Sequence, residues 1–196
     1  MDNTEKVAVA GVIGYLAELW AVPPCRQHLQ GLPAVAALFP DSGETLSWTD
    51  AQLEQWESVW QKHLAIPGSQ AFLPYETSHL PPEISPRGPQ RLAQIAGLYK
   101  RAGFSLEPWT HYPADHLGHE LRFLAALLRH QAICEQRQEH PAAANVKTWR
   151  QGFLQDHLQA WLPAFVAHVK QVTTTPFFAT LAQVTLESVS LASDLD

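Results

Sequence analysis

The sequence lacks an excess of positive charge. Its 196 residues contain 13 Lys and Arg against 19 Asp and Glu, which gives a formal net charge of −6. A protein that binds nucleic acid through its phosphates normally presents a basic patch or stripe. The composition therefore argues against DNA or RNA as a partner, and it permits a cationic partner without requiring one.

Cysteine and catalytic motifs are equally scarce. The two cysteines, Cys25 and Cys134, are far apart and follow neither a CxxC nor a metal-ligand spacing. They suggest neither a disulfide framework nor a zinc knuckle. A Gly-rich phosphate loop of the GxxxxGK[ST] type and a GxSxG nucleophile motif are also absent. The sequence predicts a protein that is not an enzyme and has no cofactor.

Long apolar runs are missing as well. Asp2, Glu5 and Lys6 occupy the N-terminus, where a secretory signal would carry a cationic region. Glu18 interrupts the apolar run that follows before it could cross a bilayer. We therefore expect a cytoplasmic protein without stable membrane insertion.

Apolar residues at helical spacing are what the sequence does contain. Thr49 and Gln52, for example, have the spacing of a capping box at the start of an apolar stripe. Convincing strand alternation is not found, so the expected fold class is all-α. We predict helices over residues 7–20, 25–30, 33–39, 49–64, about 90–102, 117 to Pro141 and 145–157, with further helices starting at Pro163 and Pro176.

Prolines punctuate residues 65–89, where the helical periodicity disappears. Six prolines in this stretch are incompatible with one continuous helix or a central strand. Unstructured segments of this length inside compact domains are uncommon and are often functional. We therefore predict a long ordered loop or linker with a functional role.

Four segments share their order and spacing with one family of proteins. They are residues 73–80 (LPYETSHL), 98–104 (LYKRAGF), 112–124 (YPADHLGHELRFL) and 153–165 (FLQDHLQAWLPAF). Together they resemble the TorD/DmsD/NarJ family of molybdoenzyme maturation chaperones, also called redox enzyme maturation proteins, and are closest to the TorD/DmsD branch. The chain departs from the family pattern at Tyr112, where members often place Glu before the signature proline.

The resemblance implies a compact TorD-like helical fold in two halves. The first half would span 1–110 and include the Pro-rich loop 65–89, and the second would span 111–196 and begin at the Pro-x-Asp-His hinge. Such a protein would bind the twin-arginine leader and the apo form of a molybdenum-cofactor oxidoreductase subunit, assist cofactor insertion and delay Tat export. The Tyr-Glu loop and the chain length favour a dimethyl sulfoxide or trimethylamine N-oxide reductase as client.

Two further partner properties come with the resemblance. Some family members have been credited with weak guanine-nucleotide binding, to which we give low weight because the phosphate-loop motif is absent. A hinge between two helical halves also makes a domain-swapped dimer accessible beside the monomer.

The resemblance also selects the candidate residues for leader and client binding, which are Tyr75, Glu76, Trp109, Pro113, Asp115, His116 and Glu120. Asp115 allows two interpretations. It could cap the long helix that follows, or it could accept a hydrogen bond from a guanidinium group of the leader. By contrast, His157, Trp161 and Phe165 fall at helical spacing and are expected to pack in the core.

Two other functions are compatible with the residues. His116, His119 and Glu120 crowd one helix start and could serve a metal-dependent helical enzyme. Their order, His-x-x-His-Glu, matches neither HExxH nor HxxEH, which disfavours that hypothesis. The second alternative is a structural interaction module.

Overall fold

The protein folds as an all-α structure, as the sequence predicts. The computed structural model describes residues 3–42, 46, 48–65, 68, 70–81, 88–106 and 111–195. The α-helices are α1 (Asn3–Ala21), α2 (Arg26–Leu29), α3 (Leu32–Leu38), α4 (Asp50–Trp60), α5 (Gly88–Arg101), α6 (Leu117–Gln136), α7 (His140–Phe153), α8 (Gln159–Val172) and α9 (Pro176–Asp194). Two 3-10 turns, η1 (Pro40–Ser42) and η3 (Glu76–Ser78), and two π turns, η2 (Gln61–Ala65) and η4 (Leu154–Leu158), complete these elements.

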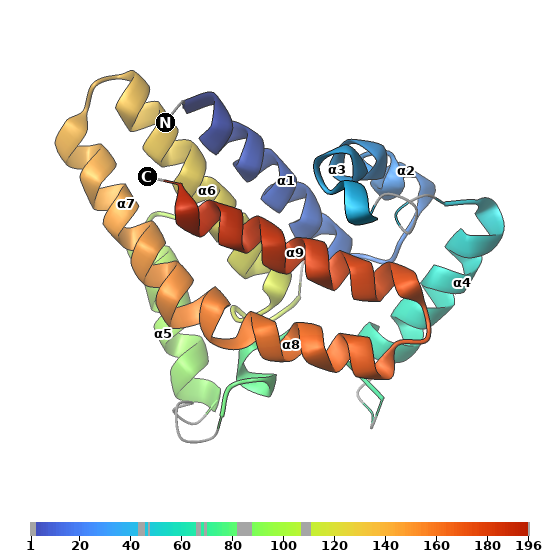
Figure 1. The fold of residues 1–196 in the computed structure, drawn as a ribbon. Helices are drawn as coiled ribbons and strands as arrows, with labels where there is room; N and C mark the ends of the chain where they lie inside the picture. The colour runs from blue at the N-terminus through green and yellow to red at the C-terminus, as the bar shows by residue number, and fades with distance from the viewer. Residues whose placement is uncertain are drawn as a thin grey trace.

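The core lies where the first helix meets the last ones. Helix α1 packs along α6 and α9, α6 packs against α7, and α8 packs against α9 (Figure 1). Trp20 of α1 is fully buried there and donates a hydrogen bond of 2.9 Å to Thr185 Oγ1 of α9. The first half of the chain therefore supplies α1 to the core of the second half, and the division into two halves stays a prediction.

Local signals set several helix ends where the sequence places them. Thr49 and Gln52 form both bonds of the predicted capping box at the start of α4. Gly103 follows α5 with a φ of +70°, a left-handed conformation that glycine adopts without steric cost. The Phe104 N–H then donates to the Tyr99 carbonyl, which closes the end of the helix.

Several predicted helix boundaries were wrong, including the start of the helix predicted at residue 145, which begins at His140. Pro163 does not start a helix but lies inside α8, because α7, η4 and α8 form one helical run that bends at η4 (Figure 1). The N–H that Pro163 lacks would have bonded Gln159, which directly follows the π turn that already disturbs the regular ladder. Helix α6 ends at Gln136 rather than Pro141, since Gln138 has a φ of 59° and α7 starts at His140.

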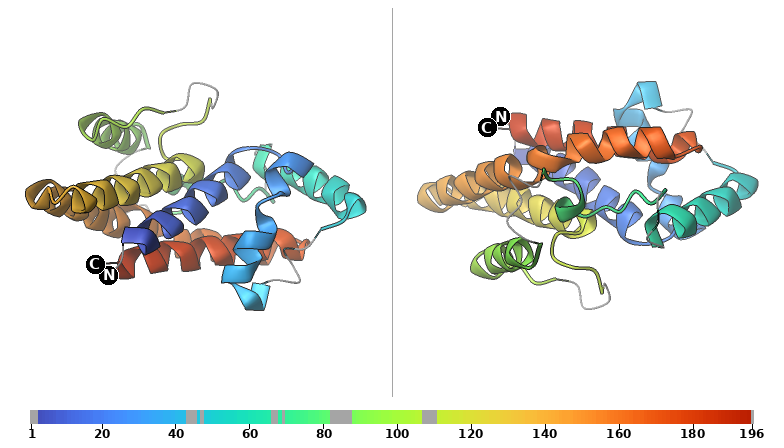
Figure 2. Two further views of the ribbon diagram at one scale, coloured as in Figure 1. Left: turned by 90° about the horizontal axis from the view of Figure 1, so that it is seen from above. Right: turned by 90° about the horizontal axis from the view of Figure 1, so that it is seen from below.

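Helix α5 stands apart from the layer formed by the long helices. Both views of Figure 2 place it to one side of α6 and α7, next to the chain segment that precedes α6. Within the described part of the chain, no helix has both the length and the apolar character that crossing a membrane would require.

Candidate functional site

The Tyr75–Glu76 loop is docked on the segment that leads into α6. The Glu76 N–H donates to the Asp115 carbonyl (3.0 Å), and the Leu117 N–H donates to the Pro74 carbonyl (2.8 Å). These bonds pair Tyr75 with His116 as an isolated antiparallel bridge, the one β-type pairing in the described residues. Two of the sequence segments that predicted the family thus meet directly in space.

Asp115 fastens this loop from the other side. Its Oδ2 accepts hydrogen bonds from the Thr77 N–H (3.1 Å) and the Thr77 hydroxyl (2.6 Å). The residue that caps α6 is instead His116, whose Nδ1 accepts the Gly118 N–H at 3.0 Å. Asp115 is therefore not the cap of α6, and its carboxyl group serves a third role that neither interpretation of the sequence included.

His116 is enclosed by aromatic side chains. The Tyr112 ring stacks on it with a centroid distance of 4.1 Å, and the Tyr75 ring meets it edge-on at 5.3 Å. Burial, together with the neighbouring His119, lowers the pKa of His116 to about 3. A neutral imidazole is what the cap requires, because its Nδ1 must keep a lone pair for the Gly118 N–H.

Glu76 is the centre of a buried ionic cluster. Its Oε1 accepts two hydrogen bonds from the Arg91 guanidinium group of α5, one of them 2.7 Å from Nε, and its Oε2 lies 2.9 Å from His157 Nδ1 of η4. Arg91 also donates to the Asp156 carbonyl at 2.7 Å. The loop, α5 and the bend between α7 and α8 are thereby held together by one carboxylate.

Glu120 extends the cluster toward the core. It is fully buried, and its Oε2 accepts the indole N–H of Trp161 at 2.9 Å. Burial, followed by the charge of Glu76, raises the pKa of Glu120 well above its usual value. Burial acts in the same direction on Glu76, but the hydrogen bond and charge of His157, with bonds from Glu120 and Arg91, outweigh it and lower the pKa of Glu76.

These opposite pKa shifts favour a proton on Glu120 over one on Glu76. With Glu120 neutral and Glu76 ionised, a hydroxyl at Glu120 Oε1 can donate to the Glu76 carboxylate. This accounts for Glu120 Oε1, a buried oxygen that faces no N–H or hydroxyl donor of another residue. A single proton on the pair would remove the repulsion between two carboxylates that lie so close together.

Metal binding was the alternative use of this region. Among the described residues, one group of three or more potential ligands comes together, with atoms of Glu76, Glu120 and His157 within 4.8 Å of one another. This is not the predicted set of His116, His119 and Glu120. The Arg91 guanidinium group is already paired with the Glu76 carboxylate. This arrangement is typical of a buried ion pair and less so of a metal site, where the carboxylate would be free to bind a cation.

The predicted binding residues come together, but most of them are buried. Exposed fractions are 0% for Glu76 and Glu120, 1% for Asp115 and 2% for His116, whereas Pro113 is exposed. Contact of the buried residues with a leader would require the loop to move, and the binding role of the whole set stays a prediction. Trp109 lies outside the described residues.

Three further residues of the site were not among the candidates. Thr77 and Arg91 were not singled out, and His157 was assigned to core packing, although it belongs to the downstream family segment. Trp161 is in the core as predicted, with no exposed surface, and it also serves the cluster through its N–H.

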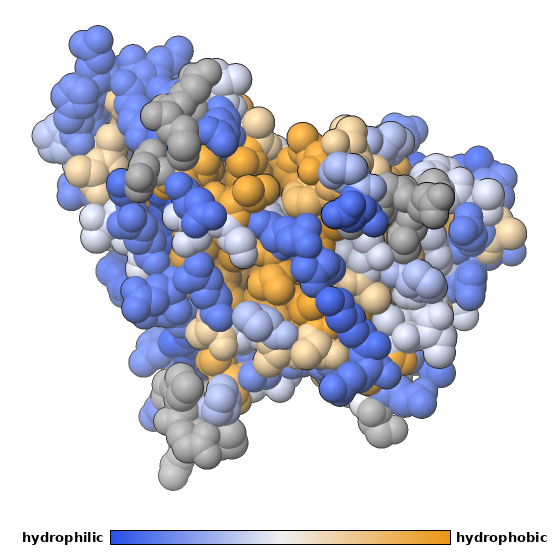
Figure 3. All heavy atoms as spheres, viewed as in Figure 1, coloured by the Kyte–Doolittle hydropathy of each residue, from blue (hydrophilic) through white to orange (hydrophobic). Residues whose placement is uncertain are grey.

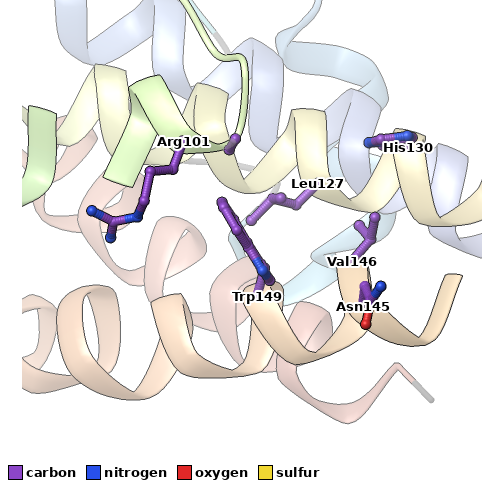
Figure 4. A pocket seen from close by; sticks show the side chains of 7 residues that line it. Arg101, Leu127, His130, Asn145, Val146 and Trp149 are labelled. Atoms are coloured by element: carbon purple, nitrogen blue, oxygen red, sulfur yellow. The ribbon is translucent and has the colours of Figure 1, made fainter. Parts of the chain in front are cut away.

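The cluster reaches the surface between α5 and α7. A groove of about 540 Å³ exposes the edges of Arg91 and His157 and continues past Arg101 and Trp149. Beyond them lies a neighbouring cavity of about 470 Å³ (Figure 4). There, Arg101 of α5 and Leu127 and His130 of α6 face the side chains that α7 contributes.

Comparison with known proteins supports the family that these segments predicted. The sequence model of the family described as nitrate reductase delta subunit matches residues 24–167. The chaperone protein TorD of Vibrio parahaemolyticus is 29% identical over 175 residues, covering 86% of this chain and 79% of that protein. A perchlorate reductase assembly chaperone of Dechloromonas aromatica is 30% identical over 93 residues, which are 47% of this chain and 41% of that protein.

The fold has a solved counterpart. The crystal structure of a redox enzyme maturation protein from Archaeoglobus fulgidus superimposes with a TM-score of 0.58 at 18% sequence identity, covering 94% of this chain and 93% of that one. The names of these proteins are those of chaperones and maturation proteins, which agrees with the prediction of a protein that is not an enzyme. The chain belongs to the nitrate reductase delta subunit family, the family of TorD-type redox enzyme maturation chaperones.

Proposed function

We propose that the protein escorts the catalytic subunit of a molybdenum-cofactor oxidoreductase in the cytoplasm. It binds the twin-arginine leader and the apo form of that subunit, assists cofactor insertion and delays export until the cofactor is in place. A dimethyl sulfoxide or trimethylamine N-oxide reductase is the favoured client. The protein is a monomer or a domain-swapped dimer, because a hinge between two helical halves makes both forms accessible.

The observation that carries this proposal is the docking of two family segments on each other. The Pro-Tyr-Glu loop is bonded to the Pro-x-Asp-His segment by backbone hydrogen bonds and by the Asp115–Thr77 contacts. The buried cluster fixes the same loop to α5 and η4 through Arg91 and His157. Such an arrangement suits a protein that positions a binding surface.

The name of one relative describes the assembly of a reductase, and the name of another describes a chaperone. The perchlorate reductase assembly chaperone aligns with 47% of this chain, and the TorD protein aligns with 86% of it. Weak binding of a guanine nucleotide is a secondary part of the proposal, because the described cavities lack a Gly-rich phosphate loop.

A pull-down from a host grown anaerobically tests the function. We expect the protein to retain the catalytic subunit of a molybdenum enzyme that still carries its leader, and deletion of the chaperone gene to reduce the activity of that enzyme. Metal analysis of protein purified without an affinity tag is the control for the metal-enzyme alternative. Stoichiometric zinc or iron that depends on His119 would contradict the chaperone function.

A further inference from the structure

A second surface of the molecule has the chemistry of a binding groove. Helices α1, α3 and α9 line an apolar cavity of about 240 Å³. None of its lining residues belongs to the Glu76 cluster. Its lining comprises Glu5, Ala8, Val9, Val12, Leu38, Phe39, Ser188 and Leu191. Figure 3 shows hydrophobic residues gathered on the face that carries α9 and the neighbouring α1 and α3.

Two leucines in this groove are unusually exposed. Leu38 leaves 60% and Leu191 leaves 49% of its surface in solvent, although both side chains are large and apolar. Scattered exposed leucines are ordinary, but two that line one concave apolar surface mark a site for another apolar chain. The cavity is smaller than the roughly 300–1,000 Å³ of small-molecule pockets, so it fits the side chains of a docked segment.

The charges around the groove are of one sign. Glu5 lines the groove itself, Asp41 follows Phe39 by two residues, and Glu187 and Asp194 belong to α9. The one Lys or Arg in the described parts of α1, α3, η1 and α9 is Lys6, which is buried and paired with Glu135 at 3.0 Å. The exposed Asp and Glu side chains of these four elements therefore favour a cationic partner, and no exposed Lys or Arg lies on their described residues.

We propose that the α1–α3–α9 groove receives the apolar stretch of a twin-arginine leader, while the surrounding acids attract its arginine pair. This inference rests on the proposed function and gives that function a place on the surface. An amphipathic or apolar helix laid in the groove would bury Leu38 and Leu191 at its centre. The binding surface would then be preformed, with no need to open the buried Glu76 loop.

Binding of a synthetic peptide tests the groove. The probe is a fluorescent peptide with two adjacent arginines followed by an apolar run of about 12 residues. We expect Leu38→Ser and Leu191→Ser each to weaken its affinity about tenfold, because each removes a large apolar contact. Ile133→Ser is the matched control: Ile133 is 45% exposed on α6, outside the groove, and its variant should bind within about twofold of wild type.

The charges are tested separately. Glu5→Gln and Asp41→Asn should each weaken the affinity for the peptide by about two- to fivefold at low salt. Added salt should reduce this difference in affinity. Glu54→Gln on α4 is the control, since Glu54 is exposed on a helix that does not line the groove. A peptide in which glutamines replace the two arginines should lose the dependence on Glu5 and Asp41.

The outcomes separate this inference from the proposed function. If wild type binds the peptide and the Leu38→Ser and Leu191→Ser proteins bind it equally well, the groove is not the site and leader binding stands. If wild type does not bind the peptide, leader binding itself fails. If the two substitutions change the oligomeric state in sedimentation but leave the affinity for the peptide unchanged, the face is an interface between copies of the chain. The inference is then overturned.

Discussion

The Glu76 cluster and the α1–α3–α9 groove distribute their side chains in opposite ways. Glu76 and Glu120 are fully buried, whereas Leu38 and Leu191 remain 60% and 49% exposed. Buried charges are tolerated only when they are paired and hydrogen-bonded, which the cluster achieves with Arg91, His157 and Trp161. The charge of Glu76 is therefore already paired within the chain, whereas the two exposed leucines have most of their surface in solvent.

This difference predicts that the cluster contributes to stability and the groove to binding. The cluster joins the Tyr75–Glu76 loop, α5 and η4, so its substitution should first affect stability. In the groove, Leu38 and Leu191 are 60% and 49% exposed, so their substitution should first affect binding. Four predictions test this division.

The largest effect is expected for Glu76→Ala. The substitution removes the fully buried carboxylate that pairs with both His157 and the Arg91 side chain, which is 15% exposed, and we expect the free energy of unfolding to fall by about 3–5 kcal/mol. Urea denaturation measures this change. The control is Arg26→Ala, which breaks an Arg26–Asp50 pair that is 68% and 64% exposed, and it should cost less than about 1 kcal/mol. Equal losses in the two variants would refute the special role of the cluster.

A smaller effect is expected for Asp115→Ala. The variant removes the acceptor of the Thr77 N–H and hydroxyl, and we expect a loss of about 1.5–3 kcal/mol in urea denaturation. Asp115→Asn should lose less, because its amide oxygen can still accept both bonds. A double-mutant cycle with Thr77→Ala should show a coupling between the two residues. Additive losses would mean that Asp115 does not hold the loop through Thr77.

The pH dependence of stability should change in Glu120→Gln. Because the folded-state pKa of Glu120 is raised, the unfolded chain ionises first, and the wild-type protein loses stability as the pH rises above about 4.3 toward that raised pKa. Gln cannot ionise, and its N–H can replace the hydroxyl facing Glu76. Urea midpoints at pH 4, 6 and 8 should therefore favour the variant increasingly. A constant difference between the two proteins would contradict a neutral Glu120.

Local signals explain what the sequence could and could not predict. The capping box at Thr49 and the left-handed Gly103 depend on neighbours within a few residues, and both were read correctly. Pro163 was misread because a proline can start a helix or sit inside one, and the deciding π turn at η4 leaves no clear sequence pattern.

The site was predictable in its location but not in its bonds. The family segments placed Glu76, Asp115 and Glu120 together. Arg91 was missed because its partners lie 15 and 65 residues away, and helical periodicity tells which face a residue lies on but not which residue it meets. The Asp115–Thr77 contact was missed for the same reason, since Thr77 lies 38 residues before Asp115. The cap interpretation was wrong, and the contact with a leader stays a prediction.

The smallest effect on stability is expected in the groove, where two leucines of one helix give a matched test. Leu32 and Leu38 both belong to α3, but Leu32 has no exposed surface and Leu38 is 60% exposed. Leu32→Ala should lower the free energy of unfolding by about 2–5 kcal/mol, because it leaves a cavity in the core. Leu38→Ala should change it by no more than about 0.5 kcal/mol, because water already covers most of that side chain. Urea denaturation of both variants beside wild type decides the point: a loss above about 2 kcal/mol for Leu38→Ala would show that this leucine supports the fold, and the exposed groove would then no longer be separable from the buried core.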